Sequence, residues 1–290
     1  MARGRADGKG TRSPLDLRAV IVSPPRVTAP EPLRALDVGA GDPVVLLHSS
    51  GMSSRQWRRL ADAIAPTHRV IAPDLLGSGQ NPPWPDGAPF HFDDDLAAIE
   101  RLLAGVPGRL HLVGHSYGGL LALKLAQRDP ARVRSLAAYD PVAWGVLYAS
   151  GDPEGLADAA RAVGLRDEEG GGSEAWFERF VDFWSGEGAW RALAEPARQG
   201  FLRVGRKVFQ EVRTLIDDRT PASAYAAVAA PALFLTGELT PLAERRVVAL
   251  LAAALPAGTS VEVAGAGHMG PLTHSAEVEE LIVKHIEAST

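Results

Sequence analysis

The feature that most restricts the fold of this 290-residue chain is the segment 110–126, whose pattern is that of a strand, a sharp turn and a helix. An apolar run leads into a turn in which Ser116 lies between Gly114 and Gly118, and a run rich in leucine and alanine follows. The glycines suit a strained turn with close neighbours, because a Cβ on either side would obstruct the packing. The serine hydroxyl then lies at a helix N-terminus, where developing negative charge is favoured.

Short apolar segments alternate with helical segments on both sides of this turn. Parallel sheets that are covered by helices on both faces have such short, continuous apolar strands. The sequence therefore predicts an α/β fold with a mostly parallel sheet. The strand-like segments are 17–22, 33–38, 44–47, 69–72, 110–113, 133–139, 231–236 and 260–264, and the helical ones are 54–65, 93–104, 120–126, 242–254 and 276–287.

The alternation stops after the sixth of these strands and resumes near residue 228. The segment 142–227 is charged, helical in pattern and rich in tryptophan, with Trp144, Trp176, Trp184 and Trp190 all inside it. We expect this segment to be a helical cap inserted into a core made of residues 15–141 and 228–290. Residues 1–14 are polar, rich in glycine and basic, which is typical of a disordered tail.

Composition excludes several classes of protein. Hydrophobic residues make up 46% of the chain, the net charge is −5, and there is no cysteine. A large core is therefore expected, whereas a nucleic-acid partner, disulfides and a thiolate metal site are not. No apolar stretch approaches the length of a membrane span, and no apolar region follows the basic start as in a signal peptide, so we expect a cytoplasmic protein. The oligomeric state stays open.

Four ordered motifs make the chain resemble the α/β-hydrolase superfamily, in particular its cap-bearing, esterase-like members. The serine turn is the first, and the resemblance covers residues 35–287. The other three are His48-Ser49-Ser50-Gly51 after a buried strand, Asp74-Leu75-Leu76-Gly77-Ser78-Gly79, and Gly265-Ala266-Gly267-His268. The resemblance implies the α/β-hydrolase fold, in which a mostly parallel sheet is flanked by helices and a helical cap is inserted after the sixth strand.

The resemblance also implies that Ser116 is a nucleophile and His268 its base. A serine hydroxyl is almost wholly protonated at neutral pH and needs an adjacent base, for which histidine has the useful pKa. His274, six residues further on, is the less favoured alternative base. We expect His48 to organise its own loop by hydrogen bonding and His115 to have a structural role.

The acid that would support the histidine is the open question. The family usually supplies an aspartate in the turn that here reads Gly237-Glu238-Leu239-Thr240, so Thr240 stands at the expected position. Threonine cannot carry the negative charge that stabilises an imidazolium. Asp140, at the end of the strand that follows the serine helix, is the preferred substitute because some α/β-hydrolases place their acid there, and Glu238 is the alternative.

The family's oxyanion hole would be formed by the backbone N–H groups of Ser50 and Tyr117. Ser49 stands where the family often has glycine, which puts the backbone conformation of this loop in question. Asp74 is expected to tie down its loop.

Aromatic side chains of the cap are candidates for substrate contacts. Trp144 and Trp184 come first, although tryptophan and phenylalanine at helical spacing, such as Phe180 and Trp184, are as typical of the cap's own core. Tyr139 and Met269 are further candidates because they flank proposed catalytic residues.

The sequence thus predicts a hydrolase without cofactor or metal, which cleaves an ester or related acyl bond of a small, partly apolar substrate through an acyl-enzyme. Lactonase, C–C bond hydrolase and perhydrolase reactions use a similar site and remain alternatives, as does a non-catalytic binding protein on the same fold. Haloalkane dehalogenase and epoxide hydrolase reactions are disfavoured, since both need a carboxylate where Ser116 stands.

Overall fold

The structure, a computed structural model, describes residue 1, residues 32–85 and residues 87–289. The predicted tail beyond Met1 and the apolar segment 17–22 lie outside the described residues. In chain order the core elements before the insert are β1 (Ala35–Val38), β2 (Pro43–Leu47), η1 (Ser54–Trp57), α1 (Arg58–Ile64), β3 (Arg69–Pro73), α2 (Phe92–Leu103), β4 (Leu110–His115), α3 (Tyr117–Arg128), η2 (Pro130–Arg132) and β5 (Val133–Tyr139). Those after the insert are β6 (Ala232–Gly237), α10 (Leu242–Ala254), β7 (Gly258–Val263), α11 (Gly270–Thr273) and α12 (Ser275–Ala288).

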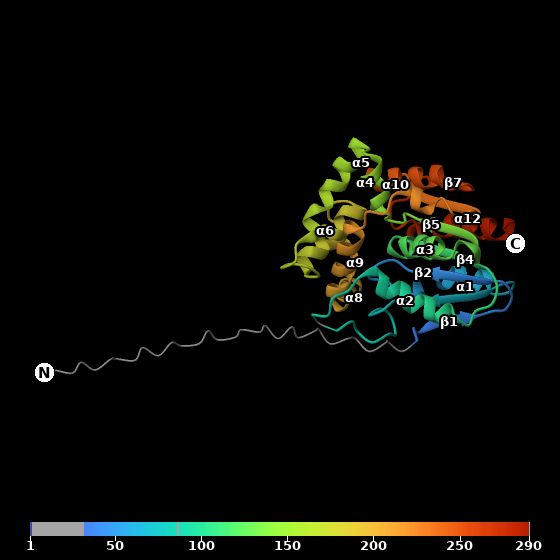
Figure 1. Cartoon of the computed structure of the whole chain (residues 1–290), viewed down its shortest axis with the longest axis horizontal. Helices are drawn as coiled ribbons and strands as arrows, with labels where there is room; N and C mark the ends of the chain where they lie inside the picture. Colours follow the sequence, from blue (N-terminus) through green and yellow to red (C-terminus); the bar gives the residue numbers. More distant parts are fainter. Residues whose placement is uncertain (2–31, 86, 290) are drawn as a thin grey trace. The chain divides into compact units, whose positions relative to one another are not determined.

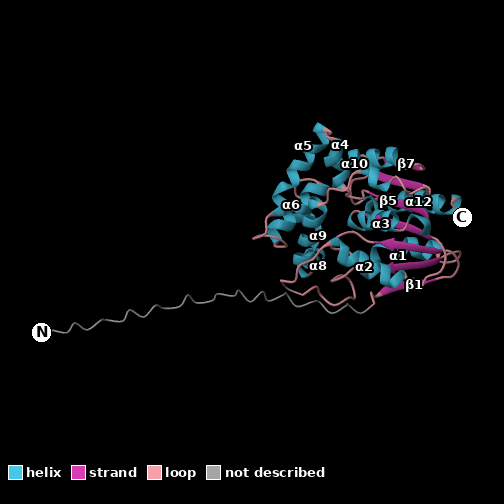
Figure 2. Cartoon of the chain, viewed as in Figure 1, coloured by secondary structure: helices cyan, strands magenta, loops and turns pink. Residues whose placement is uncertain are grey.

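The seven strands of the described residues form one sheet in the order β1-β3-β2-β4-β5-β6-β7 (Figures 1 and 2). Only β1 runs antiparallel to its neighbour, and the other pairs are parallel. The carboxyl ends of β2, β4, β5 and β6 therefore lie side by side at one edge of the sheet. In open α/β sheets this edge carries the functional loops.

Alternate residues of the strands serve two separate hydrophobic cores, one on each face of the sheet. Val45 and Leu47 of β2 pack with the buried residues of α2, α3 and α10. Val44 and Leu46 pack on the other face with those of α1 and α12. This alternation explains why the central strands are apolar along their whole length.

The helical insert lies between β5 and β6, within the range 142–227 predicted from the sequence. Figure 2 shows it as a group of helices without strands. Its elements are α4 (Trp144–Ser150), α5 (Pro153–Ala159), η3 (Ala160–Arg166), α6 (Glu174–Ser185), α7 (Ala189–Ala192), α8 (Glu195–Arg203), α9 (Gly205–Asp217) and η4 (Ala222–Tyr225). The insert follows the fifth described strand and not the sixth, because the apolar segment 17–22 lies outside the described residues.

The predicted elements agree with the structure to within a few residues, and one differs in kind. The helix expected over 54–65 begins as the 3-10 turn η1 before it becomes α1. Within the described residues, no helix is both long and apolar enough to cross a membrane.

Candidate active site

Ser116 lies at a strained turn between β4 and α3. Its φ is 55°, in the left-handed region that non-glycine residues rarely adopt. The turn depends on the two flanking glycines: a Cβ on Gly114 would lie 2.2 Å from the carbonyl oxygen of Gly118, and one on Gly118 would lie 2.2 Å from that of Leu47. The Ser116 N–H donates to the carbonyl of Tyr139 at 2.9 Å, which extends the sheet into the turn.

Three side chains from separate loops form a continuous hydrogen-bonded line. Ser116 Oγ lies 3.0 Å from His268 Nε2, and His268 Nδ1 lies 3.0 Å from Asp140 Oδ2. All three are nearly inaccessible to solvent. With the Nδ1 proton directed to Asp140, Nε2 is free to accept the hydrogen bond of the Ser116 hydroxyl, which is the arrangement that a general base requires.

Asp140 is held where β5 ends, next to the position at which the family's acid was expected. Its N–H donates to the carbonyl of Leu235 at 2.9 Å, which sets the end of β5 beside β6. Thr240 Oγ1, on the turn after β6, donates to Asp140 Oδ2 at 2.9 Å. Thr240, which stands where the aspartate was expected, thus donates a hydrogen bond to the carboxylate of Asp140.

Glu238 lies apart from this line. Its side chain is exposed, and Oε2 accepts from the N–H of Gly265 at 2.8 Å. The carboxylate therefore braces the loop that carries His268 and makes no contact with the imidazole.

A second buried carboxyl, Glu244 of α10, supports the turn after Asp140. It accepts from the N–H of Val142 at 2.9 Å and from Trp144 Nε1 at 3.0 Å. Val142 has a φ of 45°, which strains a β-branched residue. Burial raises the pKa of Glu244 to about 8, and the nearby charge of Asp140 adds to the shift. Burial also raises the pKa of Asp140, while the hydroxyls of Thr236 and Thr240 oppose this.

The insert covers His268 with an aromatic ring. Trp184 of α6 stacks on the imidazole with ring centroids 3.9 Å apart and an interplanar angle of 21°. Burial lowers the pKa of His268 to about 3, so the ring is neutral at neutral pH in this closed arrangement.

A small apolar cavity adjoins Ser116. Its free volume of about 10 Å³ has room for about one water molecule. Of the predicted substrate contacts, Trp144 and Trp184 line it. The remaining lining residues are Ser50, Ser116, Val142, Leu165, Phe180, Val212, Leu215 and Ile216. Substrate binding therefore requires side chains of the insert to move.

Tyr139 and Met269 are not among the residues that line this cavity. Tyr139 is the last residue of β5, and its ring packs in the hydrophobic core on the face of the sheet that α1 and α12 cover. There its hydroxyl donates to the carbonyl of Gly267 at 2.7 Å. Tyr139 thus braces the His268 loop, and nothing in the geometry favours its predicted contact with substrate.

The loop after β2 is fixed by buried hydrogen bonds. His48 Nδ1 lies 2.8 Å from the Ser49 carbonyl, and His48 Nε2 accepts from the Leu75 N–H at 3.0 Å, which confirms its predicted role. Ser49 is tolerated in place of glycine because the left-handed conformation falls on Gly51, with φ 75°. Ser50 reaches the cavity beside Ser116, and Tyr117, the first residue of α3, has no helical partner for its N–H.

A further chain of hydrogen bonds joins this loop to the histidine loop. The Ser49 N–H donates to Gln56 Oε1 at 3.1 Å, Gln56 Nε2 lies 3.1 Å from His115 Nδ1, and His115 Nε2 lies 2.8 Å from the carbonyl of His268. His115 is therefore structural, as predicted.

Two other predictions from the sequence concern residues outside the hydrogen-bonded line of Ser116, His268 and Asp140. His274 Nδ1 contacts the hydroxyl of its neighbour Thr273, so the alternative base does not meet Ser116. Asp74 accepts from the N–H groups of Ser54 and Gln80, which confirms that it ties down its loop.

Sequence reasoning missed a buried charged cluster under the serine turn and Glu244 beside Asp140. The cluster consists of Asp95 on α2 with Lys207 and Glu211 on α9. A signal was present, since Lys207 and Glu211 are four residues apart and share a face of a strongly amphipathic helix with Leu215. Among the described residues, no group of three or more histidine, aspartate or glutamate side chains is arranged to hold a metal ion.

The buried His111 of β4 provides a prediction on pH and stability. Burial, and then the nearby His68, lower its pKa to about 4. Between pH 6.5 and 4 the unfolded chain binds a proton here that the folded chain does not, so the free energy of unfolding falls as the pH falls. We expect His111→Asn, whose amide retains a partner for Ser135, to lose about 2 kcal/mol of this pH dependence.

Denaturant unfolding of both proteins at pH 7.5 and pH 4.5 measures this difference. All other titrating groups are common to the two proteins, so an equal pH dependence would show that His111 is not the group responsible.

The fold and the Ser116–His268–Asp140 geometry define the class of α/β proteins that carry a serine at a strand-to-helix turn. A model of the α/β-hydrolase family matches residues 44–281, and the chain belongs to this family.

Similar proteins span several reactions. The chain is 29% identical over 265 residues to a pimeloyl-[acyl-carrier protein] methyl ester esterase of Aeromonas hydrophila, a match that covers 84% of this chain and 95% of that protein. It is 40% identical over 104 residues to a 2-hydroxy-6-oxo-2,4-heptadienoate hydrolase of Pseudomonas putida, covering 34% of this chain and only 37% of that protein. A thermophilic esterase from Thermogutta terrifontis has a similar fold, with a TM-score of 0.65 and 24% identity over 89% of this chain and 93% of that one. The chain is thus a member of a hydrolase family with diverse substrates.

Proposed function

We propose that the protein is a cofactor-independent serine hydrolase that cleaves an ester or related acyl bond of a small, partly apolar substrate. The observation that carries the proposal is the hydrogen-bonded line from Ser116 Oγ through His268 to Asp140, which ends in an apolar cavity. A nucleophile, a base within hydrogen-bond distance and an acid that orients the base are what acyl transfer requires.

The mechanism follows from the positions of these atoms. His268 Nε2 takes the Ser116 proton as Oγ attacks the substrate carbonyl, and Asp140 stabilises the resulting imidazolium. The N–H groups of Ser50 and Tyr117 hold the oxyanion. His268 then gives the proton to the leaving group, and water activated by the same nitrogen hydrolyses the acyl-enzyme.

A C–C bond hydrolase is the second candidate. The partial similarity to the 2-hydroxy-6-oxo-2,4-heptadienoate hydrolase favours it, because the two proteins are 40% identical over 104 residues. The near-complete alignment with the methyl ester esterase favours ester cleavage.

Reaction with a fluorophosphonate probe tests the proposal and separates an enzyme from a binding protein on the same fold. We expect a folded wild-type protein to be labelled stoichiometrically at Ser116, as identified by peptide mass, and to hydrolyse short p-nitrophenyl esters. A folded protein that resists the probe would contradict the proposal and favour the binding protein.

A further inference from the structure

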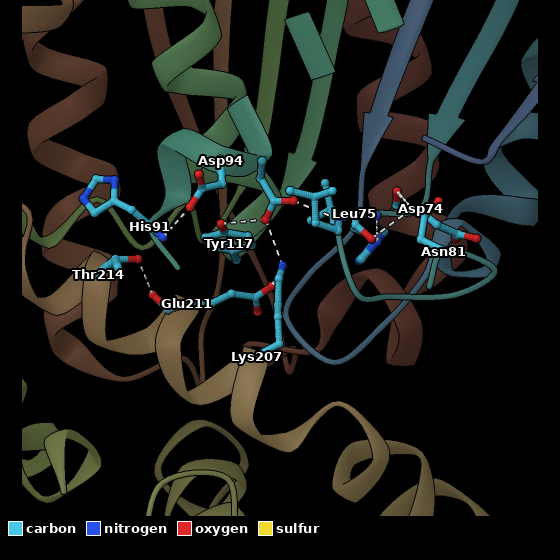
Figure 3. Close-up of polar contacts among 12 residues, drawn as sticks. Asp74, Leu75, Asn81, His91, Asp94, Tyr117, Lys207, Glu211 and Thr214 are labelled. Carbon is cyan, nitrogen blue, oxygen red and sulfur yellow. Dashed lines mark hydrogen bonds and ion pairs between the residues drawn. The ribbon is translucent and has the colours of Figure 1, made fainter. Parts of the chain in front are cut away.

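A buried cluster of charged side chains joins the insert to the core beneath the serine turn. Lys207 Nζ donates to Asp95 Oδ2 at 2.8 Å and also to Glu211 Oε1 one helical turn along α9. Figure 3 shows Lys207 and Glu211 extending from the same helix, with the Glu211 carboxylate beside Lys207 and the Lys207 amine directed towards the side of Tyr117. All three charged side chains are buried, with exposed fractions of 3% or less.

Asp95 connects this cluster to Tyr117. The Tyr117 hydroxyl donates to Asp95 Oδ2 at 2.9 Å, while Asp95 Oδ1 accepts from the Leu76 N–H at 2.9 Å. The position of Asp95 is fixed locally, because it lies in the first turn of α2, which begins at Phe92 with a capping box of His91 and Asp94.

Glu211 is the member of the cluster whose pKa Ser50 affects. Burial raises the pKa of Glu211, while Lys207 and the Ser50 hydroxyl oppose that shift. Its Oε2 has no hydrogen-bond partner within the described residues. Of the two residues whose N–H groups would form the oxyanion hole, Tyr117 therefore bonds the cluster through its hydroxyl, and Ser50 affects it by lowering the pKa of Glu211.

Stability alone does not account for such a cluster. A buried ion pair gains little over apolar side chains of similar volume, because the desolvation of both charges offsets their attraction. Here a single lysine faces two carboxyls, so Glu211 is in excess of the pair formed by Lys207 and Asp95.

We propose that Lys207 and Glu211 are positioning residues for the oxyanion hole, so that helix α9 of the insert completes the hole when it lies on the core. The inference rests on the proposed function. It assigns the insert a part in transition-state stabilisation, in addition to covering the substrate.

Glu211→Leu is the most direct test, because it removes the carboxyl that holds Lys207 from the side of α9 and leaves the Lys207–Asp95 pair intact. We expect kcat for p-nitrophenyl acetate to fall about 10-fold or more, with KM changed less than about 2-fold, since a misplaced donor weakens only the transition state. The melting temperature should not fall, because the variant loses a carboxyl that is costly to bury. Glu211→Gln, which keeps the hydrogen-bonding groups, should restore most of kcat.

Gln210→Leu is the matched control. Gln210 is the preceding residue of α9, is also buried, and bonds only the Ala88 carbonyl. We expect this variant to keep the wild-type kcat.

Tyr117→Phe tests the other half of the cluster and serves if Glu211→Leu does not fold. It removes the bond to Asp95 but keeps the backbone N–H, and kcat should again fall while KM holds. Wild-type kcat in a folded Glu211→Leu or Tyr117→Phe protein would overturn the inference, as would an equal loss in Gln210→Leu or no recovery in Glu211→Gln.

The rate of fluorophosphonate labelling of Ser116 gives the same comparison without an ester. If the wild type is labelled but turns over no ester, the proposed function is wrong while the inference is still judged by the labelling rates of the variants. Equal labelling rates in Glu211→Leu and wild type would overturn the inference alone.

Discussion

Ser116→Ala is expected to lower the turnover of short p-nitrophenyl esters by roughly five orders of magnitude or more, because no other group can form the acyl-enzyme. The fold should survive, since the Ser116 hydroxyl bonds only His268 within the described part of the chain. Initial-rate assays together with far-ultraviolet circular dichroism measure both effects.

Ser135→Ala is the matched control for this variant. Ser135 of β5 is also a buried serine with a histidine partner, since its Oγ lies 2.8 Å from His111 Nδ1. It lies in the sheet away from the cavity, so full activity is expected. Ester turnover by a folded Ser116→Ala protein at the wild-type rate would exclude the serine mechanism.

Asp140→Asn is expected to lower kcat by about four orders of magnitude, because an amide cannot stabilise the imidazolium and favours the wrong tautomer. Glu238→Gln should leave kcat nearly unchanged, since the exposed Glu238 side chain bonds only the Gly265 N–H. Steady-state kinetics of the two purified variants give the ranking, and the reverse ranking would assign the acid to Glu238.

The assignment of Asp140 as the acid can also be tested with a second substitution, at Thr240, that restores a carboxylate to the site. The Thr240 hydroxyl donates to Asp140 Oδ2, which itself meets His268 Nδ1, so a carboxylate at position 240 would lie near the imidazole. We expect Asp140→Asn combined with Thr240→Asp to recover part of the lost kcat. No recovery in a folded double variant would mean that the turn after β6 no longer reaches the imidazole.

The sheet, the serine turn and the histidine loop could be predicted from the sequence because each depends on neighbours in the chain. Gly114 and Gly118 indicate the close contacts of a single turn. His268 is recognised because it lies in a glycine-rich loop after a strand. Asp140 was the preferred acid because it ends the strand after the serine helix, where some α/β-hydrolases place theirs, so this prediction rested on the resemblance.

Contacts between the insert and the core could not be predicted in this way. Lys207 bonds Asp95, which lies 112 residues away in the sequence, and Trp144 bonds Glu244, which lies 100 residues away. The periodicity of hydrophobic residues within one helix or strand gives no information on such distant pairs. Tyr139 shows a different limit: its nearness in sequence to Asp140 suggested a shared site, whereas its ring packs in the core and its hydroxyl bonds the Gly267 carbonyl.

The stacking of Trp184 on His268 has a consequence for the resting enzyme. Burial lowers the pKa of the imidazole, and an indole ring of the insert stacks on it. Any motion that lifts the indole to admit a substrate also hydrates the imidazole and returns its proton affinity towards that of free histidine. In the closed protein His268 is therefore a weak base. Displacement of the indole by an entering substrate would raise the pKa of the imidazole and make it a stronger base for Ser116.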